Sequence, residues 1–121
     1  MKKKTILVID DDATNRKLME TILKNKGGYE VIEASNGLEG LDKLNPDISL
    51  IFLDLIMPVI DGIKFLEIIK TEKPEFTNIP VIVLTTDDSK KQQALQAGAK
   101  EVIIKPVNPV DILEKVVAYS S

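Results

Sequence analysis

The stretch Ile6-Leu7-Val8-Ile9-Asp10-Asp11-Asp12 places a short apolar run directly before three acidic residues. A continuous apolar run of this length is typical of a strand that is covered on both faces of a parallel sheet. The run from Tyr29 to Ala34 is weaker, because Glu30 and Glu33 interrupt it, and it predicts an edge strand. Further apolar runs extend from Ile48 to Leu53, from Ile79 to Leu84 and from Val102 to Ile104.

Segments with helical spacing of apolar residues lie between and after these runs. The fourth segment, from Asp88 to Ala97, offers only a thin apolar face. Typical stop and start residues bound the segments: Gly27, Pro46 and Gly98 as stops, Asp61 and Asn108 as caps. The expected core-facing residues are Leu18, Met19, Ile22 and Leu23; Leu38, Leu41 and Leu44; Ile63, Phe65, Leu66, Ile68 and Ile69; Ala94, Leu95 and Ala97; and Ile112, Leu113, Val116 and Val117.

Strand-like and helix-like segments thus alternate five times without a linker or a repeat. This order predicts an α/β fold with a parallel sheet and right-handed crossovers. Because five units are too few for an eight-stranded barrel, we expect an open, doubly wound (βα)5 sandwich. The length of 121 residues fits one domain over residues 1–121.

The composition excludes several classes of function. A net charge of −3 argues against broad binding to nucleic acids or anionic membranes. The chain has no Cys and no His, which excludes disulfides, Cys-bound zinc and the usual general base at neutral pH. No apolar run approaches the roughly 20 residues of a membrane span, and the N-terminus lacks the apolar stretch of a signal peptide, so we expect a cytoplasmic protein.

Polar residues follow the ends of four predicted strands. These are Asp10-Asp11-Asp12 after the first, Asp54 after the third, Thr85-Thr86 after the fourth and Lys105-Pro106 after the fifth. In open parallel sheets ligands bind outside the carboxyl ends of the strands, so these side chains are expected to converge. Structural roles remain open for some of them: Asp12 can cap the first helix, Thr85 can end a strand and Lys105 can extend into solvent.

The predicted convergence suggests a particular chemistry. Clustered carboxylates repel one another unless a cation lies among them, and an oxygen-only ligand set favours Mg²⁺. The ammonium of Lys105 and the hydroxyl of Thr85 suit phosphoryl oxygens. Asp54 is a possible carboxylate nucleophile. The residues therefore suggest Mg²⁺-dependent phosphoryl transfer onto an aspartate.

Taken together, four motifs resemble the CheY-like receiver domain of two-component response regulators. They are residues 6–12, Asp54-Leu55-Ile56-Met57-Pro58-Val59-Ile60-Asp61-Gly62, Pro80-Val81-Ile82-Val83-Leu84-Thr85-Thr86, and Lys105-Pro106. The resemblance covers the whole chain, and the four motifs in this order and spacing are specific. It implies a flavodoxin-like fold with the strand order 2-1-3-4-5, which is known for CheY.

The resemblance also implies roles for the residues that could bind a metal. Asp54 would be the phospho-acceptor, and Asp11 and Asp54 would bind Mg²⁺ directly together with the backbone carbonyl of Ile56. Asp10 would act mainly through a metal-bound water.

For the phosphoryl group, the resemblance implies that Thr85 hydrogen-bonds it, that Lys105 pairs with it and that the Lys105-Pro106 bond is cis. The phosphodonor would be a phosphohistidine on a sensor histidine kinase or a histidine phosphotransfer protein. The domain would be a signalling module rather than an enzyme, and it would act on a downstream protein or output domain.

Three residues depart from the family pattern. Val102 stands three residues before the Lys, where many receivers carry a Tyr or Phe that acts as a rotamer switch. Val107 follows the Lys-Pro pair, where Phe is frequent, and Ile60 replaces a frequent Met. The first two departures bear on the coupling to output and leave the acceptor chemistry unchanged.

Other readings remain open from the residues alone. Asp10-x-Asp12-x-Thr14 also fits the first motif of haloacid-dehalogenase-type phosphatases, with Asp10 as nucleophile and Asp12 as acid and base. That reading leaves Asp54 unexplained. A flavodoxin-like carrier would need a first loop that cradles phosphate, whereas three Asp repel it. A receiver that has lost phosphorylation and only docks partners is a further reading, and the complete acidic set argues against it.

Overall fold

The computed structural model describes residues 4–120 and contains one five-stranded sheet. All neighbouring strands pair in parallel in the order β2-β1-β3-β4-β5, which confirms the predicted fold and the edge position of the second strand. Residues 1–3 and 121 of the predicted domain lie outside the described residues. The strands are β1 Thr5–Ile9, β2 Glu30–Ala34, β3 Ile48–Asp54, β4 Val81–Thr85 and β5 Glu101–Ile104.

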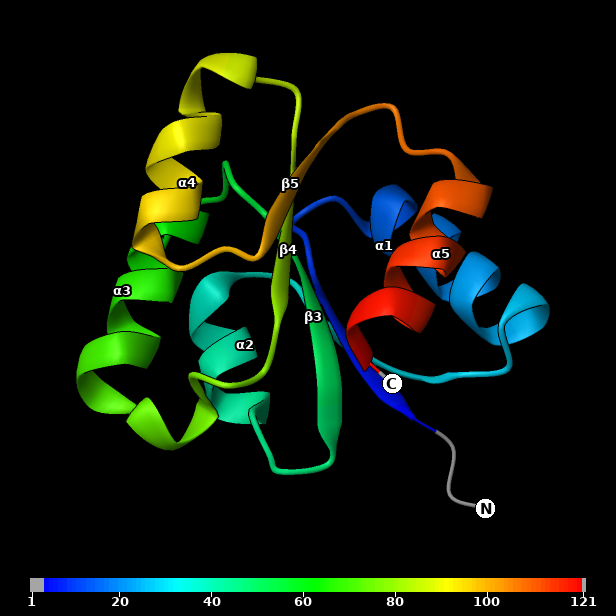
Figure 1. The fold of residues 1–121 in the computed structure, drawn as a ribbon, viewed down its shortest axis with the longest axis horizontal. Helices are drawn as coiled ribbons and strands as arrows, with labels where there is room; N and C mark the ends of the chain where they lie inside the picture. The colour runs from blue at the N-terminus through cyan, green and yellow to red at the C-terminus, as the bar shows by residue number, and fades with distance from the viewer. Residues whose placement is uncertain (1–3, 121) are drawn as a thin grey trace.

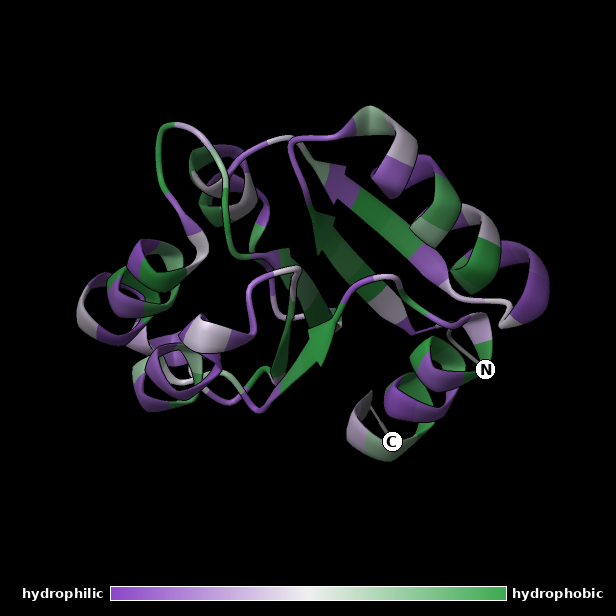
Figure 2. Ribbon diagram, turned by 90° about the horizontal axis from the view of Figure 1, so that it is seen from above, coloured by the Kyte–Doolittle hydropathy of each residue, from purple (hydrophilic) through white to green (hydrophobic). Residues whose placement is uncertain are grey.

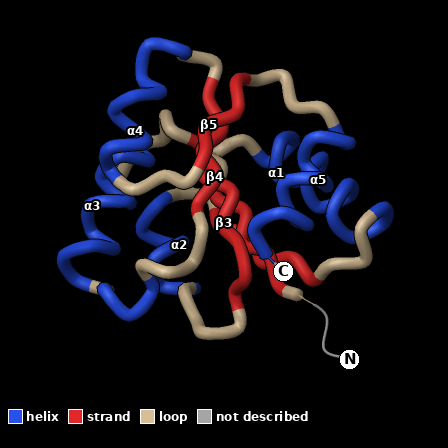
Figure 3. The backbone as a smooth tube through the Cα atoms, viewed as in Figure 1, coloured by secondary structure: helices blue, strands red, loops and turns tan. Residues whose placement is uncertain are grey.

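Helices cover both faces of the sheet (Figures 1 and 3). α2, α3 and α4 pack on one face, and α1 and α5 pack on the other. No helix in residues 4–120 has the length and apolar content that crossing a membrane requires. The helices are α1 Ala13–Thr21, continued by a π-helical turn Ile22–Lys26; α2 Gly37–Lys43; α3 Gly62–Glu72; α4 Lys91–Ala97; and α5 Pro109–Ser120.

Side chains that accept backbone hydrogen bonds fix where the helices begin. The carboxylate of Asp61 accepts from the Lys64 N–H at 2.8 Å, and the amide oxygen of Asn108 accepts from the Val110 N–H at 2.8 Å, as the sequence predicts. Asp12 caps α1 in the same way, so the structural role considered for it is confirmed.

The core consists of two apolar clusters, one on each side of the sheet (Figure 2). β3 contributes to both, because successive side chains of a strand point to opposite faces. Ile51 and Leu53 lie in the cluster under α2, α3 and α4, whereas Leu50 and Phe52 lie in the cluster under α1 and α5. Burial on both faces explains the continuous apolar sequence of this central strand.

Three predicted core residues are exposed instead. The exposed fractions are 49% for Leu18, 50% for Leu38 and 64% for Val117, so these assignments were wrong. Leu18 precedes the buried Met19, and Val117 follows the buried Val116. Neighbours in a helix point about 100° apart, so a narrow buried stripe includes one residue and leaves the next in solvent.

Leu38 is exposed because α2 packs on the sheet through glycines. Gly37, Gly40 and Leu41 form its buried face. A Cβ atom at Gly40 would lie 2.5 Å from Ile9 Cδ1, so a larger residue there would displace the buried Ile9 side chain. A prediction from hydropathy therefore assigns Leu38 to the core, because Gly37 and Gly40 carry no hydropathy signal.

The predicted fourth helix is also less regular than expected. Its first turn, Asp88–Lys90, is a 3₁₀ turn, and the α-helix begins only at Lys91. Gly98 follows the helix with a φ of +123°, a conformation that favours glycine, as the predicted stop requires. The short α4 faces the core mainly through Ala94, which is its fully buried side chain.

Candidate functional site

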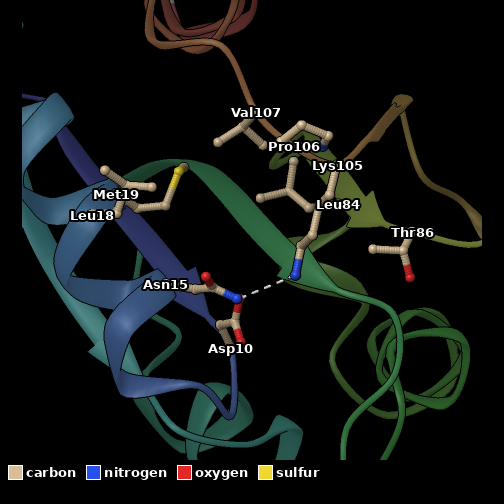
Figure 4. Close-up of a pocket in the computed structure, with 9 residues that line it drawn as sticks. All are labelled: Asp10, Asn15, Leu18, Met19, Leu84, Thr86, Lys105, Pro106 and Val107. Atoms are coloured by element: carbon tan, nitrogen blue, oxygen red, sulfur yellow. Dashed lines mark ion pairs between the residues drawn. The ribbon is translucent and has the colours of Figure 1, made fainter.

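The carboxyl ends of the strands bring the predicted site residues to one edge of the sheet. Asp10 follows β1, Asp54 ends β3, Thr85 ends β4 and Lys105 follows β5. The Nζ atom of Lys105 lies 3.5 Å from Asp10 Oδ2 and 3.4 Å from Asp54 Oδ1. Figure 4 shows the pairing of Lys105 with Asp10. Lys105 therefore reaches the acidic residues instead of extending into solvent.

Three carboxylates form a compact group here. Asp10, Asp11 and Asp54 each offer an oxygen within 4.8 Å of the others. Asp10 and Asp54 are buried, whereas Asp11 is exposed, so the group opens to solvent on one side. Such a set of oxygen donors could hold a metal ion, and hard cations such as Mg²⁺ prefer oxygen ligands.

The surroundings of Asp54 favour its neutral form. Burial raises the pKa of this carboxyl to about 6, and the nearby charge of Asp10 adds to the effect. The ammonium of Lys105 opposes the shift, and Asp11 raises the pKa slightly further. The group is therefore a carboxylate held in a position where its negative charge is costly unless a cation compensates it.

Backbone and arginine contacts hold Asp10 in place. Its Oδ1 atom accepts a hydrogen bond from the Asp12 N–H at 2.9 Å, which leaves Oδ2 toward Lys105. Arg16 Nη1 donates to the Asp10 carbonyl at 2.6 Å, and Arg16 Nε lies 3.4 Å from Glu33 Oε1. The sequence reasoning missed Arg16. Arg16 is the single arginine of the chain and follows the helix cap Asp12 by four residues. A planar guanidinium at this position can donate hydrogen bonds to the ends of two neighbouring strands, which is the only sequence feature that could have indicated its role.

Thr85 is buried at the end of β4. Its Oγ1 accepts a hydrogen bond from the Asp87 N–H at 3.1 Å, and its carbonyl accepts from the Lys105 N–H at 2.8 Å. Within residues 4–120 the hydroxyl forms no hydrogen bond with Asp54. The hydroxyl proton thus remains available for another acceptor, while the oxygen ties Thr85 to the segment that leads into α4.

Backbone hydrogen bonds between its own residues close the loop from Leu55 to Gly62, which follows Asp54. The Gly62 N–H donates to the Leu55 carbonyl at 2.8 Å, and a Cβ at Gly62 would lie 2.9 Å from the Asp54 carbonyl oxygen. Within the loop, the Ile60 N–H donates to the Pro58 carbonyl at 2.8 Å across Val59, whose φ is +70°. This is a tight three-residue turn. Ile56 lies in the same loop, two residues after Asp54.

Two further features adjoin the site. The Lys105-Pro106 bond is cis, as the resemblance implies. An apolar cavity of about 390 Å³ lies beside Lys105, between α1 and the segment after β5 (Figure 4). Val107 and the exposed Leu18 both line this cavity.

Comparisons with known proteins agree with this geometry. Residues 6–117 match the family model of the response regulator receiver domain. The chain belongs to this family. Because the receiver family accounts for nearly the whole chain and for its strand order, the phosphatase and flavodoxin-like carrier readings are wrong.

Individual receiver proteins show the same relationship. The chemotaxis protein CheY homolog of Campylobacter jejuni is 33% identical over 114 residues, which cover 91% of this chain and 87% of the relative. A CpxR homolog of Haemophilus influenzae, a transcriptional regulatory protein, is 35% identical over 115 residues, which cover 93% of this chain and 48% of the relative. A receiver domain protein from Methanospirillum hungatei superposes with a TM-score of 0.84 at 33% identity, covering 97% of this chain and 93% of that one.

Proposed function

We propose that this receiver domain accepts a phosphoryl group on Asp54 in a Mg²⁺-dependent reaction. The donor is a phosphohistidine of a sensor histidine kinase or a histidine phosphotransfer protein. The observation that carries the proposal is the buried Asp54 carboxylate between two further carboxylates and the Lys105 ammonium. An oxygen of Asp54 forms the new bond to phosphorus as the P–N bond breaks, and the departing imidazole keeps the electron pair and takes up a proton.

The donor set fits Mg²⁺. Asp10, Asp11 and Asp54 supply carboxylate oxygens, with Asp10 acting mainly through water, and the carbonyl of Ile56 completes the proposed set. When bound, the ion neutralises charge on the carboxylates and on the phosphoryl oxygens. The absence of His and Cys from the chain leaves oxygen ligands as the main choice, which suits this ion.

Lys105 and Thr85 act on the phosphoryl group. Lys105 already lies 3.4 Å from Asp54, so its ammonium is placed to pair with a phosphoryl oxygen there. The Thr85 hydroxyl donates a hydrogen bond to another phosphoryl oxygen while its oxygen still accepts one from the Asp87 N–H. Movement of Thr85 toward the phosphoryl group therefore draws the segment that precedes α4.

The proposal also covers the setting of the domain. Residues 1–121 act as one receiver domain in the cytoplasm, and the phosphorylated form signals to a downstream protein or output domain. It is a signalling domain that assists its own phosphorylation and dephosphorylation, and not a turnover enzyme. It binds neither nucleic acid nor membranes directly, in line with its net charge of −3.

The acceptor assignment is tested with acetyl phosphate as a small phosphodonor. Intact mass spectrometry should show one phosphoryl adduct on the wild type with Mg²⁺ and little or none with EDTA. Asp54→Asn should show no adduct, whereas Asp42→Asn, at an exposed position on α2, should behave as the wild type. An adduct on Asp54→Asn equal to that of the wild type would refute the acceptor, and equal labelling in EDTA would refute the metal requirement.

The switch is tested by amide NMR with beryllofluoride, a mimic of the phosphoryl group. Val102 is buried in the core under α4 and has no aromatic ring to rotate. The response should therefore run through Thr85 and the backbone after it. Thr85→Ala should still bind beryllofluoride but lose most of the α4 shifts, while Val102→Ala keeps them. Equal loss in both variants contradicts this route.

A further inference from the structure

A cleft separates α3 from α4 on the side of the sheet edge that carries Asp54. It encloses about 550 Å³, and the loop after Asp54 forms its floor, including the buried Met57. Lys64 and Glu67 line it from α3, and Lys90 and Gln93 line it from the opposite side. Figure 1 shows the two helices as neighbours on the same face of the sheet.

The same two helices are in contact at their other ends. The Nζ atom of Lys70 on α3 donates to the Gln96 carbonyl on α4 at 3.3 Å. A Cβ at Gly98 would lie 3.0 Å from Lys70 Cε, so the chain passes close to this side chain directly after α4. The two helices are thus tied at the end of α4 and separated at its beginning.

The wall formed by α4 is the one that can move. α3 has eleven residues and buries Phe65, Leu66 and Ile69, whereas α4 has seven and fully buries Ala94 alone. The segment that leads into α4 is a 3₁₀ turn, which lacks the regular hydrogen bonding of an α-helix. Few buried apolar contacts mean that displacement of this helix costs little free energy.

Opposite charges face each other across the open end. Glu67 and Lys90 line opposite walls, and within residues 4–120 neither is in an ion pair shorter than 4 Å, although hydrogen bonds and, to a smaller extent, the charge of Lys90 lower the pKa of Asp87 in the same segment. Of the other charged groups that line the cleft, Asp61 accepts a hydrogen bond from the Lys64 N–H, and Lys64 is on the same helix as Glu67. Lys90 is therefore the cation on the far wall that a closing motion would bring to Glu67.

We propose that α3 and α4 form a closing joint, in which the start of α4 swings about the Lys70–Gln96 contact until Lys90 pairs with Glu67. The proposal rests on the proposed function, because phosphorylation at Asp54 moves Thr85 toward the phosphoryl group, and Thr85 in turn moves Asp87 and the segment before α4. Closure buries the floor of the cleft and adds an ion pair that exists only in the phosphorylated state. The ion pair favours that state over the unmodified one.

Spin-label distances test the joint directly, because a chain without cysteine can be labelled at engineered cysteines alone. One label on α2 at Asp42→Cys serves as the reference, paired with Lys91→Cys at the start of α4 or with Gln96→Cys at its end. Beryllofluoride with Mg²⁺ should shorten the distance to position 91 and leave the distance to position 96 unchanged. ¹⁹F NMR reports separately whether beryllofluoride has bound.

Charge variants then test the ion pair. Glu67→Gln and Lys90→Gln should each lose most of the shortening and weaken apparent beryllofluoride affinity about two- to threefold, while the exchanged pair Glu67→Lys with Lys90→Glu restores both. Gln92→Glu, which alters the charge of α4 outside the cleft lining, should change neither. Bound beryllofluoride without shortening overturns the joint and leaves the proposed function standing. Failure of beryllofluoride to bind overturns both.

Discussion

α4 and α5 flank the same strand, β5, but the two helices are held very differently. α5 has twelve residues and buries Ile112 and Val116 completely, and its last turns contact Glu101 through Lys115 and Tyr119, both at 2.7 Å. α4 has seven residues and one fully buried alanine. The difference shows how one sheet can keep one neighbouring helix fixed while the other responds to the chemistry at the strand ends.

The first test of this comparison removes a fully buried side chain of α5, Ile112. Ile112→Ala should lower the free energy of unfolding by about 3 kcal/mol, because it deletes a fully buried side chain and leaves a cavity. Ala94→Gly on α4 should cost only about 1 kcal/mol, mostly through helix propensity. Urea unfolding measures both. Equal costs for the two variants would mean that α4 is anchored as firmly as α5.

The second test concerns the proposed acceptor, Asp54, at the carboxyl end of β3. The folded pKa of Asp54 is raised to about 6, so folding favours the protonated group, and stability is lost as the pH rises from about 4 to 6. Without Mg²⁺, Asp54→Asn should therefore stabilise the protein by about 2 kcal/mol at pH 7.5 and by much less at pH 4.

Urea unfolding in EDTA at the two pH values checks this result, with Asp42→Asn as the control. Lys105 keeps Asp10 as a partner at 3.5 Å in the variant, so it is not left without a counter-charge. A variant that is no more stable than the wild type at pH 7.5 would show that Lys105 already compensates the carboxylate.

The third test weakens the contact between α5 and β5. Burial raises the pKa of Glu101, but hydrogen bonds from Lys115 and Tyr119 outweigh it and hold the pKa below the usual range. The stabilisation is thus present above the unfolded pKa of about 4.3 and is lost as the pH falls through the lower folded value. Glu101→Gln should cost about 1 kcal/mol at pH 7, and the difference from the wild type should shrink below about pH 4.

Thermal unfolding at several pH values measures this difference. Glu114→Gln is the control, since it removes an exposed carboxylate from α5, the helix that Glu101 on β5 holds. A cost for Glu101→Gln that does not change with pH would show that packing, and not the ionised carboxylate, holds the end of α5.

The smallest expected effect comes from removing the hydrogen bond between Lys70 on α3 and the Gln96 carbonyl at the end of α4. Lys70→Met removes an exposed hydrogen bond to Gln96, so the free energy of unfolding should change by less than about 0.5 kcal/mol. Amide hydrogen exchange in α4 should nevertheless become faster, while exchange in α5 stays the same. Unchanged exchange in α4 would show that this contact does not restrain the helix.

The sequence predicts the sheet well because burial on both faces demands continuous apolar runs, as in β3. It predicts the site for a related reason: the residues after parallel strands must meet at one edge, which brings Asp10, Asp54 and Lys105 together. The metal ligands and the acceptor role of Asp54 remain predictions.

Helix orientation was harder to predict, and the reason is geometric. The buried face of α2 contains Gly37 and Gly40, which carry no hydropathy signal but allow the helix to approach β1. The role of Arg16 depends on a contact between the first turn of α1 and Glu33 on β2, residues that are distant in sequence. Such contacts arise only when the elements pack, so local patterns do not contain them.

The two edges of the sheet have a consequence for self-association. An open strand edge offers unpaired backbone groups to which a strand of another molecule can add. β2 carries Glu30 and Glu33 along its edge, and charged side chains there oppose such addition. The other edge, β5, has only four residues, too few to offer a long template. The parallel sheet thus carries its own protection against growth into a larger aggregate.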